Sequence, residues 1–432
     1  MSAKKRDESL PALARLERLP MRGMRLGLAA IDAVCERLGR PERAVASVLV
    51  AGTNGKGSAA ATLSAIAEEA GIASGLYTSP HLESVTERIR IRRADVTAGE
   101  LDATLAEVFA AADRAPAVPV TYFEAMTGAA FLAFARSPVE LAILEVGLGG
   151  RLDATNVAPA CVSLVTSIGL DHLEELGPTV ASIAREKAGV FRAGRAALVD
   201  GRVPDALRTF REAAAASGAE LHDMWEESCL SGVEPGADGT RFRLCTPVRE
   251  YALATPLAGA HQAANAAMAA RAAELLPGFA VDEGAIVRGV ASVRWPGRLE
   301  QFQVRGRTVL LDGCHNPDGA AALGLFLADT GIEADLVFGA MADKDVEGMA
   351  GVLAPMVRRI RLVPAASERA ASPEDLRRRF SRWRDDAEAS PSLTAALEER
   401  LSDETSETII VAGSLYLVGE ARSLLLSGRF GS

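Results

Sequence analysis

The stretch LVAGTNGKGS, residues 49–58, joins an apolar run to a glycine-rich segment that contains a single lysine. Residues 43–51 are predicted to form a buried strand, and residues 58–71 a helix that stops at a glycine. Between a strand and a helix, backbone N–H groups and the amino end of the helix can surround a phosphate, and glycines let the chain approach its oxygens. The stretch therefore predicts a phosphate-binding loop.

This loop departs from the common phosphate-loop pattern G-x-x-x-x-G-K-[ST]. Val50 stands where the first glycine of that pattern belongs, and Gly57 separates Lys56 from Ser58. Lys56 is expected to place its positive charge beside the outer phosphates, and the Ser58 hydroxyl to face a metal ion. The alternative is a tight turn with an exposed lysine, but the strand–loop–helix context favours phosphate binding.

Short apolar runs alternate with helical patterns along most of the chain, which predicts parallel sheets covered by helices. The other elements expected in the first part of the chain are strands at 73–79, 139–147 and 161–169, helices at 123–136, 211–220 and 261–276, and a β-rich excursion at 221–256.

The alternation restarts after Pro296 and Gly297, which break both helix and strand. We predict an α/β fold with two domains. Residues 1–294 form a P-loop-containing, mostly parallel sheet with helices on both faces, and residues 295–432 form a smaller Rossmann-like α/β domain. The strands expected in the second domain lie at 308–313, 334–340, 358–364 and 407–413.

The chain is acidic: 57 Asp and Glu residues outnumber 47 Lys and Arg residues, for a formal net charge of −10. This balance argues against a general affinity for nucleic acid, whose backbone demands clustered cations. An anionic small substrate is still compatible with it, because a local group of arginines and lysines can act inside an acidic protein.

The cysteines indicate a reducing compartment. Five lie far apart, without a C-x-x-C pair: Cys35, Cys161, Cys229, Cys245 and Cys314. We expect reduced, buried thiols rather than a disulfide framework or a zinc site. The first residues lack the apolar core of a signal peptide, and no stretch approaches the roughly 18 apolar residues of a membrane span. We therefore predict a cytoplasmic protein without a membrane partner.

Oxygen-bearing side chains stand at the predicted ends of parallel strands, where ligands of open α/β sheets gather. They are Ser79, Glu145 and the residues after the strand at 161–169. Mg²⁺ prefers such hard oxygen ligands, and a carboxylate inside an apolar run needs a partner or a metal. The alternatives are that Ser79 caps the turn made by Pro80 and that Glu145 pairs with Arg151.

GTNGKGS resembles the nucleotide loop of the Mur-ligase superfamily, and specifically of its folylpolyglutamate synthase and dihydrofolate synthase family. The resemblance spans nearly the whole chain beyond about residue 22. Further stretches match in the same order: YTSPHL (77–82), LEVGLGGRLDATN (144–156), TSIGLDH (166–172), REKAGVF (185–191), HQAAN (261–265), WPGRLE (295–300), DGCHNP (312–317) and DKD (343–345).

The resemblance implies binding sites for ATP and for two magnesium ions. The ATP-binding residues that it implies are Thr53, Asn54, Gly55, Lys56, Gly57, Ser58, Asn265, Arg298 and Asp312. The magnesium ligands that it implies are Ser58, Ser79, Glu145 and His172. Histidine is an unusual Mg²⁺ ligand, so ligand softness alone would not select His172. The alternative is that Asp171 and His172 simply begin a helix.

Lys187 lies in SIAREKAGVF (182–191), a helical stretch in which Arg185 and Glu186 suggest an ordinary solvated face. The family carries a carbamylated lysine in the matching REKAG, so the resemblance implies that Lys187 is carbamylated. A carbamate turns the cation into a carboxylate-like acceptor. The residues that the resemblance implies for catalysis are Lys56, Glu145, His172 and Lys187.

Two segments match those that hold the pterin end of dihydropteroate in bifunctional family members: Thr121, Tyr122, Phe123 and Glu124, and Leu152, Asp153 and Ala154. A ring at Tyr122 or Phe123 can stack on a flat heterocycle, and Glu124 or Asp153 can accept hydrogen bonds from its amino edge. The alternative is that the two aromatic residues belong to the core. Arg25 stands where bifunctional relatives often have an acidic residue, which bears on the balance between the two activities.

The function that the resemblance implies is ATP-dependent amide ligation. L-glutamate is added to dihydropteroate, to folates or to both through an acyl phosphate, with release of ADP and phosphate. The expected partners are these small molecules, and the chain is expected to be a monomer. The alternative is another Mur-type ligase that acts on a cell-wall or storage peptide precursor. A nucleotide switch without ligation leaves Glu145, His172 and Lys187 without a role, and a generic phosphotransferase should not require glutamate for turnover.

Overall fold

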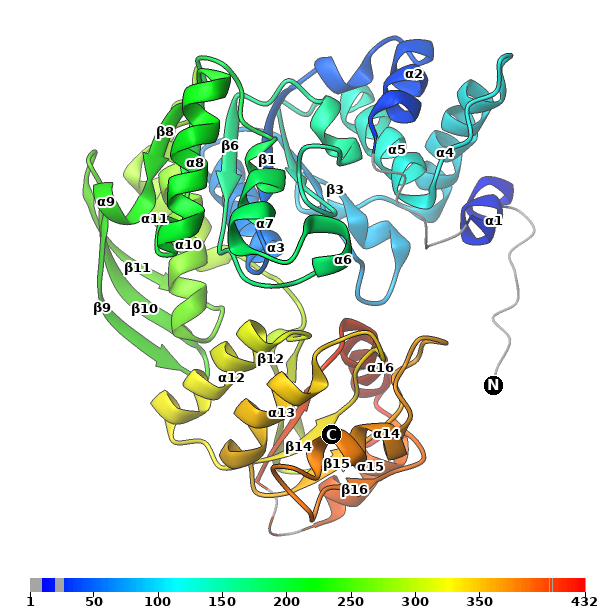
Figure 1. Ribbon diagram of the computed structural model, residues 1–432, viewed down its shortest axis with the longest axis vertical. Helices are drawn as coiled ribbons and strands as arrows, with labels where there is room; N and C mark the ends of the chain where they lie inside the picture. Colours follow the sequence, from blue (N-terminus) through cyan, green and yellow to red (C-terminus); the bar gives the residue numbers. More distant parts are fainter. Residues whose placement is uncertain (1–9, 20–26, 404, 406, 432) are drawn as a thin grey trace. The chain divides into compact units, whose positions relative to one another are not determined.

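The computed structural model describes residues 10–19, 27–403, 405 and 407–431. Arg25 lies outside the described residues. The chain forms two compact units, which are both visible in Figure 1. Unit 1 consists of the chain up to Leu230, with Leu244–Tyr251 and Asn265–Ser292, and unit 2 of Ser231–Arg243, Ala252–Ala264 and the chain from Val293 onward. The domain limits 1–294 and 295–432 stay a prediction.

Unit 1 contains an eight-stranded sheet in the order β4-β3-β2-β5-β1-β6-β7-β8, in which β3 runs antiparallel to both of its neighbours and all other pairs are parallel. The strands are β1 Ala46–Ala51, β2 Ser74–Tyr77, β3 Ile89–Ile91, β4 Ala94–Asp95, β5 Leu141–Glu145, β6 Val162–Val165, β7 Ala196–Val199 and β8 Glu220–Asp223. The predicted parallel sheet is therefore confirmed, with an antiparallel edge.

The register of the three central strands brings their carboxyl ends to one edge of the sheet. Val50 of β1 lies beside Glu145 of β5, and Ala51 lies beside Val165 of β6. The loops that follow β1, β5 and β6 therefore begin side by side. This edge carries the glycine loop and Glu145, as expected for ligand sites of open α/β sheets.

Helices cover both faces of this sheet. They are α1 Pro11–Arg18, α2 Ala29–Arg37, α3 Lys56–Glu69, α4 Ala98–Asp113, α5 Tyr122–Arg136, α6 Leu173–Leu176, α7 Val180–Ala188, α8 Pro204–Ser217, α9 Met224–Glu227, α10 Ala260–Glu274 and α11 Glu283–Ser292. Short 3₁₀ helices occur at η1 Pro41–Arg43, η2 Val85–Arg88 and η3 Ala154–Val157. In Figure 1, α2, α4 and α5 lie beside one another, and the three helices are in contact.

One core lies beneath α5, α7 and α8, where Phe131 and Phe210 pack with Leu49, Ala51 and Leu144 of the central strands. The alternating strand residues Val48, Val50 and Ile143 are also buried but do not belong to this core, and the same is true of Ile66 in α3. Because parallel crossovers are right-handed, α3 and α5, which lead in opposite directions along the sheet, cover opposite faces.

Helix α3, which follows the glycine loop, is buried from Gly57 to Ala67. It packs against α11, where a Cβ at Gly289 would collide with the backbone of Ile66. The small residues of KGSAAATLSAIAEE therefore allow α11 to pack closely on α3 and help to shield it from solvent.

The predicted β-rich excursion is confirmed. Besides β8, it contains a three-stranded sheet in the order β11-β10-β9, formed by β9 Cys229–Gly236, β10 Gly239–Cys245 and β11 Glu250–Thr255. Burial alternates along β10 and β11, so one face of this sheet is covered and the other is exposed.

Unit 2 contains a six-stranded sheet in the order β12-β13-β17-β14-β15-β16, parallel except for β12. Its core contains Leu310, Leu336 and Ile410 of the central strands. The four strands predicted here are confirmed. The elements are β12 Arg298–Val304, β13 Arg307–Asp312, β14 Ala334–Phe338, β15 Ile360–Leu362, β16 Glu388–Ala389, β17 Thr408–Ala412, α12 Pro317–Thr330, α13 Val346–Leu353, η4 Ala354–Met356, α14 Pro373–Phe380, α15 Leu393–Ser402 and α16 Leu415–Leu426.

Two sequence-based expectations need correction. The helix expected at 211–220 is the second half of α8, which ends at Ser217 because Gly218 adopts a left-handed conformation with a φ of 72°. The five cysteines are free. Cys35 and Cys314 are buried as expected, Cys161 is half-buried, and Cys229 and Cys245 are exposed, so the expectation of buried thiols is wrong for the last two. Among the described residues, no helix is both long enough and apolar enough to cross a bilayer.

Candidate active site

The glycine loop, residues 52–58, depends on two glycines with positive φ. Gly52 has a φ of 146°, and a Cβ there would collide with the Thr166 hydroxyl. Gly55 has a φ of 84° and precedes the first residue of α3, and a Cβ there would collide with the Asn265 side chain. The following residues, Lys56 to Ser58, present the N–H groups of the first helical turn, which have no partner within the helix. The geometry is that of an anion-binding loop.

Two lysines converge on a single backbone carbonyl of this loop. The Lys56 ammonium donates to Gly52 O and Thr53 O, both at 3.1 Å, and Lys187 Nζ donates to Gly52 O at 2.7 Å. Lys187 comes from α7 and is only 4% exposed, so the alternative of a solvated face is wrong for this residue.

The neighbourhood of Lys187 favours its neutral form. Burial and then the positive charge of Lys56 lower the pKa of Lys187 from 10.5 to about 7, while the negative charges of Asp171 and Asp153 act in the opposite direction. The amine is therefore largely unprotonated slightly above neutral pH.

The loop that follows β6 braces the glycine loop. Thr166 and Ser167 donate their hydroxyls to Asn54 O, at 2.8 and 3.2 Å. The Thr53 N–H donates to Ser167 O at 2.7 Å, and the Thr53 hydroxyl bonds to the backbone of Gly169. Backbone groups and hydroxyls of the loop after β6 thus hold Thr53 and Asn54, in addition to the Lys56 ammonium on Thr53 O.

Glu145, at the end of β5, is 5% exposed, and its Oε2 accepts the Ser79 N–H at 3.0 Å. The structure thus brings these two predicted metal ligands together. The alternative that Glu145 pairs with Arg151 is wrong, because Arg151 pairs with Glu186 at 2.9 Å.

His172 begins α6 as its N-cap residue, with a φ of 53°, and its side chain is 44% exposed. Its ring nitrogens lie 4.0 Å from Asp171 Oδ1 and 3.9 Å from Glu175 Oε2. Within the described part of the chain, no three His, Cys, Asp or Glu side chains gather closely enough to hold a metal ion. Ser58, the fourth predicted ligand, is buried at the start of α3.

Phe123 and Asp153 meet over Gly147, where a Cβ would lie 2.6 Å from the Phe123 ring and 3.1 Å from Asp153 Oδ2. Asp153 is 4% exposed and accepts hydrogen bonds from Leu148 N at 2.9 Å and Thr155 N at 3.0 Å. Burial raises the pKa of this carboxyl, although these hydrogen bonds act in the opposite direction. Its neighbours Leu152 and Ala154 are half-buried and buried.

Residues 121–124 open α5 with a reciprocal cap. Thr121 N and Oγ1 both donate to Glu124 Oε2 at 2.8 Å, and Glu124 N donates to Thr121 Oγ1 at 3.2 Å. The other carboxylate oxygen of Glu124, Oε1, is buried without a hydrogen-bond partner among the described residues. Tyr122 stacks beneath the guanidinium of Arg88, with Cζ 5.1 Å from the ring centroid. The first turn of α5 thus contains a buried acceptor, Glu124 Oε1, without a hydrogen bond among the described residues.

Unit 2 contains a second cluster of predicted residues. Asp312, at the end of β13, accepts hydrogen bonds from Leu299 N at 3.2 Å and Cys314 N at 3.0 Å. Arg298 donates to Gly297 O at 3.0 Å. Burial lowers the pKa of His261. The charge of Asp312 raises this pKa and the charge of Arg298 lowers it, so the three side chains share one electrostatic environment. Asn265, the remaining predicted ATP residue, belongs to unit 1 and faces Gly55.

Comparison with known proteins identifies the family. The Mur ligase middle domain matches residues 50–273, and the Mur ligase, glutamate ligase domain matches residues 297–415. The chain is 34% identical to the dihydrofolate synthase/folylpolyglutamate synthase of Escherichia coli, over 97% of this chain and 96% of that protein. The chain belongs to the folylpolyglutamate synthase/dihydrofolate synthase family of Mur ligases.

A solved structure of a family member agrees. The structure of E. coli FolC in complex with DHPP and ADP matches with a TM-score of 0.87 and 32% identity, over 96% of this chain and 97% of that one. The probable bifunctional folylpolyglutamate synthase/dihydropteroate synthase of Haloferax volcanii is 37% identical over 92% of this chain, which spans only 48% of that relative's length. Membership of this family confirms the predicted α/β ligase fold, while the roles of individual residues stay predictions.

Three residues of the site were not singled out from the sequence: Arg88, Thr166 and His261. Thr166 and His261 lie in stretches that carry the family resemblance, but their types and spacing give no separate signal. The contacts of Arg88 with Tyr122 and of Thr166 with Asn54 join residues far apart in the chain. They become visible only in three dimensions.

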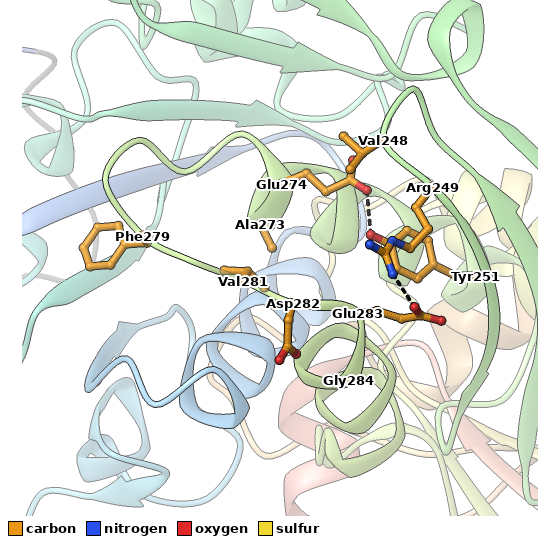
Figure 2. A pocket seen from close by; sticks show the side chains of 10 residues that line it. All are labelled: Val248, Arg249, Tyr251, Ala273, Glu274, Phe279, Val281, Asp282, Glu283 and Gly284. Atoms are coloured by element: carbon orange, nitrogen blue, oxygen red, sulfur yellow. Dashed lines mark hydrogen bonds and ion pairs between the residues drawn. The ribbon is translucent and has the colours of Figure 1, made fainter.

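A cavity of about 340 Å³ lies elsewhere in unit 1, between the turn before β11, the end of α10 and the start of α11 (Figure 2). It contains none of the predicted site residues. Most of its polar side chains are already bonded: Arg249 bonds to Glu283, the Tyr251 hydroxyl donates to Glu274 at 2.8 Å, and Asp282 accepts the Ala285 N–H. Because these groups are already bonded, the cavity does not indicate a ligand chemistry.

Proposed function

We propose that this protein uses ATP to join L-glutamate to the carboxyl group of dihydropteroate, of a reduced folate or of both. The observation that carries this proposal is the convergence of Lys56 and Lys187 on Gly52 O, at the head of a sealed helix, in a chain of this family. Two amino groups that share one carbonyl repel each other when both are charged. A polyphosphate beside Lys56 and a neutral Lys187 would relieve that repulsion.

The nucleotide is expected at the glycine loop, and E. coli FolC has been solved with ADP. The N–H groups at the start of α3 would hold phosphate oxygens, and Lys56 would exchange its two backbone carbonyls for a phosphate. Asn265, which faces Gly55, lies beside this loop. Arg298 and Asp312 of unit 2 are proposed to contact ATP as well, as the family resemblance implies.

The residues at the strand ends fit magnesium. Glu145 offers a hard carboxylate oxygen that is almost sealed from solvent, and the hydroxyls of Ser58 and Ser79 are ligands of the same kind. We propose that these three residues, with His172, hold two Mg²⁺ ions. When bound, the ions neutralise charge on the transferring phosphoryl group.

The acid substrate is proposed to lie along residues 121–124 and 152–154. Glu124 Oε1, which is buried and lacks a hydrogen bond among the described residues, and the Asp153 carboxylate are acceptors suited to the amino edge of a pterin. Phe123 offers a ring face beside Asp153. The solved E. coli FolC complex contains DHPP as well as ADP. The alternative of a cell-wall or storage peptide precursor is not favoured, since these relatives are named for folate substrates.

The proposed reaction has two steps. A carboxylate oxygen of the acid attacks the γ-phosphorus of ATP, ADP leaves, and an acyl phosphate forms. The uncharged amine of glutamate then attacks the acyl carbon and loses a proton, and phosphate leaves with the electrons of the broken C–O bond. Lys56 and the N–H groups of the loop stabilise the negative charge that moves in the first step.

Lys187 is proposed to be carbamylated. Only an unprotonated amine reacts with CO₂, and a pKa of about 7 leaves much of the Lys187 amine in that form at neutral pH. The product replaces one of two adjacent cations with an anion, which removes the repulsion from Lys56. Uptake of isotopically labelled CO₂ by the wild type but not by Lys187→Arg, followed by NMR, tests this modification.

We further propose that the protein acts in the cytoplasm as a monomer, with small molecules as its only partners. The net charge of −10 supports the absence of nucleic-acid binding. Size-exclusion chromatography with light scattering tests the oligomeric state.

Phosphate release tests the function directly. Purified protein is given ATP and Mg²⁺ with dihydropteroate or tetrahydrofolate, with and without L-glutamate. Glutamate-dependent release is expected with at least one acid, and mass spectrometry should show one added glutamate per phosphate. Release that does not depend on glutamate, or none with either acid, contradicts the proposal.

A further inference from the structure

Arg88 is a buried arginine without an acidic partner in the described part of the chain. It is 7% exposed. Its Nε donates to His81 Nδ1 at 2.9 Å, and its guanidinium stacks on Tyr122. The neighbouring carboxylate, Glu87, is occupied by the N–H groups of residues 82–84 at 2.7–2.9 Å. Neither terminal nitrogen of Arg88 is sealed from solvent. Both are therefore available as donors to a ligand.

The position of Arg88 is fixed on two sides. Its backbone carbonyl accepts the Thr78 N–H at 3.0 Å. Thr78 precedes Ser79, whose N–H bonds to Glu145, so this bond holds the backbone of Arg88 beside the Ser79–Glu145 pair. Its side chain reaches Tyr122 at the start of α5. Arg88 thus stands between the proposed magnesium ligands and the proposed substrate segment.

A guanidinium in this position needs an anion. Burying an unpaired charge is costly, and an arginine that stacks on a ring presents a planar fork that matches a carboxylate. It offers donors only, whereas Glu124 and Asp153 offer acceptors. We propose that Arg88 binds a carboxylate of the acid substrate, while Glu124 and Asp153 bind its heterocycle. This inference rests on the proposed function and adds the residue that holds the anionic end.

Two carboxylates have this chemistry. In dihydropteroate the anion is the benzoate itself, which is also the group that reacts. In a folate that already carries glutamate, it is the α-carboxylate beside the reacting γ-carboxylate. In both cases the reacting oxygen is held close to the end of β2, where Ser79 and Glu145 meet. Arg88 therefore selects acids by charge and fixes the orientation of the reacting group.

The test compares each acid with an uncharged analogue. Calorimetry with ADP present measures binding of dihydropteroate and its carboxamide, and of tetrahydrofolate and its α-carboxamide, to wild type and Arg88→Gln. We expect Arg88→Gln to weaken binding of the acids about 30-fold or more and to leave binding of the carboxamides nearly unchanged. In turnover, the KM for the acid should rise while the KM for ATP stays the same. The acid that loses affinity identifies which carboxylate Arg88 holds.

Arg90→Gln is the matched control, because it removes the same charge two residues away, where Arg90 pairs with Asp95 at 2.6 Å. It should leave the acid-to-carboxamide ratio unchanged. If Arg88→Gln does not fold, Arg88→Lys replaces it. The affinity for the acid relative to that for its carboxamide should still fall, because lysine lacks the planar guanidinium that matches a carboxylate. An equal loss for acids and carboxamides, or no loss, overturns the assignment of Arg88. Failure of the wild type to bind either acid or to release phosphate overturns the proposed function instead.

Discussion

The glycine loop (residues 52–58) and the substrate segment (residues 121–124) are built by different means. In the glycine loop, backbone carbonyls receive the important contacts: Gly52 O takes two lysines, and Asn54 O takes two hydroxyls. In the substrate segment, side chains do so, through the Thr121–Glu124 cap and the stack of Tyr122 with Arg88. A site made of backbone depends on its glycines and on the cations around it, whereas a site made of side chains depends on each side chain separately.

The largest effect is expected at the centre of the glycine loop. Lys56→Ala should lower kcat about 1000-fold, on the order of 4 kcal/mol, because it removes the charge proposed to stabilise the transferring phosphoryl group. The free energy of unfolding should not fall, since within the described residues the hydrogen bonds of Lys56 go to its own loop. Phosphate release and urea denaturation measure the two quantities. Arg208→Ala, which removes an exposed cation of α8, is the control. Near-wild-type turnover in Lys56→Ala would contradict a role of the glycine loop in the reaction.

Lys187→Met should stabilise the protein near neutral pH. The folded-state pKa of about 7 lies below the ordinary 10.5, so between these values the unfolded chain binds more protons at this residue. The stability of the wild type should therefore rise with pH across that window and be lowest at and below pH 7. In CO₂-depleted buffer, Lys187→Met should gain on the order of 3 kcal/mol at pH 7 and lose this pH dependence. Denaturation at several pH values measures it, and parallel curves for the two proteins contradict the expectation.

Phe123→Ala should act on the substrate segment alone. Loss of the ring face beside Asp153 should raise the KM for the acid about 10-fold while the KM for ATP stays the same. Phe279→Ala, in the separate cavity, is a control that removes a half-buried ring without touching the segment. A rise in the KM for ATP would mean that the two regions are not independent.

The smallest effect is expected at the helix cap. Thr121→Ala removes the reciprocal bonds with Glu124 and should cost about 1 kcal/mol of stability. Thr97→Ala removes the same kind of cap, with Glu100, from α4 and should cost a similar amount. Only Thr121→Ala should also weaken binding of the acid, because it releases Glu124. Equal acid affinity in both variants would leave Glu124 with a structural role only.

The same contrast explains what the sequence alone could predict. The central strands of both sheets were predicted because fully buried parallel strands are continuous apolar, β-branched runs. They are β1, β2, β5 and β6 in unit 1 and β13, β14, β15 and β17 in unit 2. The glycine loop was predicted because the residues that form it, 52–58, are consecutive in the sequence. Helix α4 and strand β7 were not specified, although α4 carries the cap signal of Thr97 and Glu100.

The substrate segment was reached only through resemblance, since its contacts are not local. Arg88 meets Tyr122, and Asp153 meets Phe123 over Gly147. Each pair joins residues far apart in the chain, and no local pattern records such pairs. The burial of Lys187 was missed for the same reason, since its helix reads as a charged surface until the glycine loop is placed against it. Both the contacts of the substrate segment and the burial of Lys187 therefore depend on tertiary structure.

The composition of α3 has a consequence for the thermodynamics of nucleotide binding. Alanine and glycine, which form much of its sealed length, lose little or no side-chain rotamer freedom on folding. The helix at the proposed nucleotide site is thus ordered before any ligand arrives, and association incurs little additional loss of conformational entropy there. Calorimetry should accordingly find that ADP binding lacks the large unfavourable entropy that accompanies coupled folding.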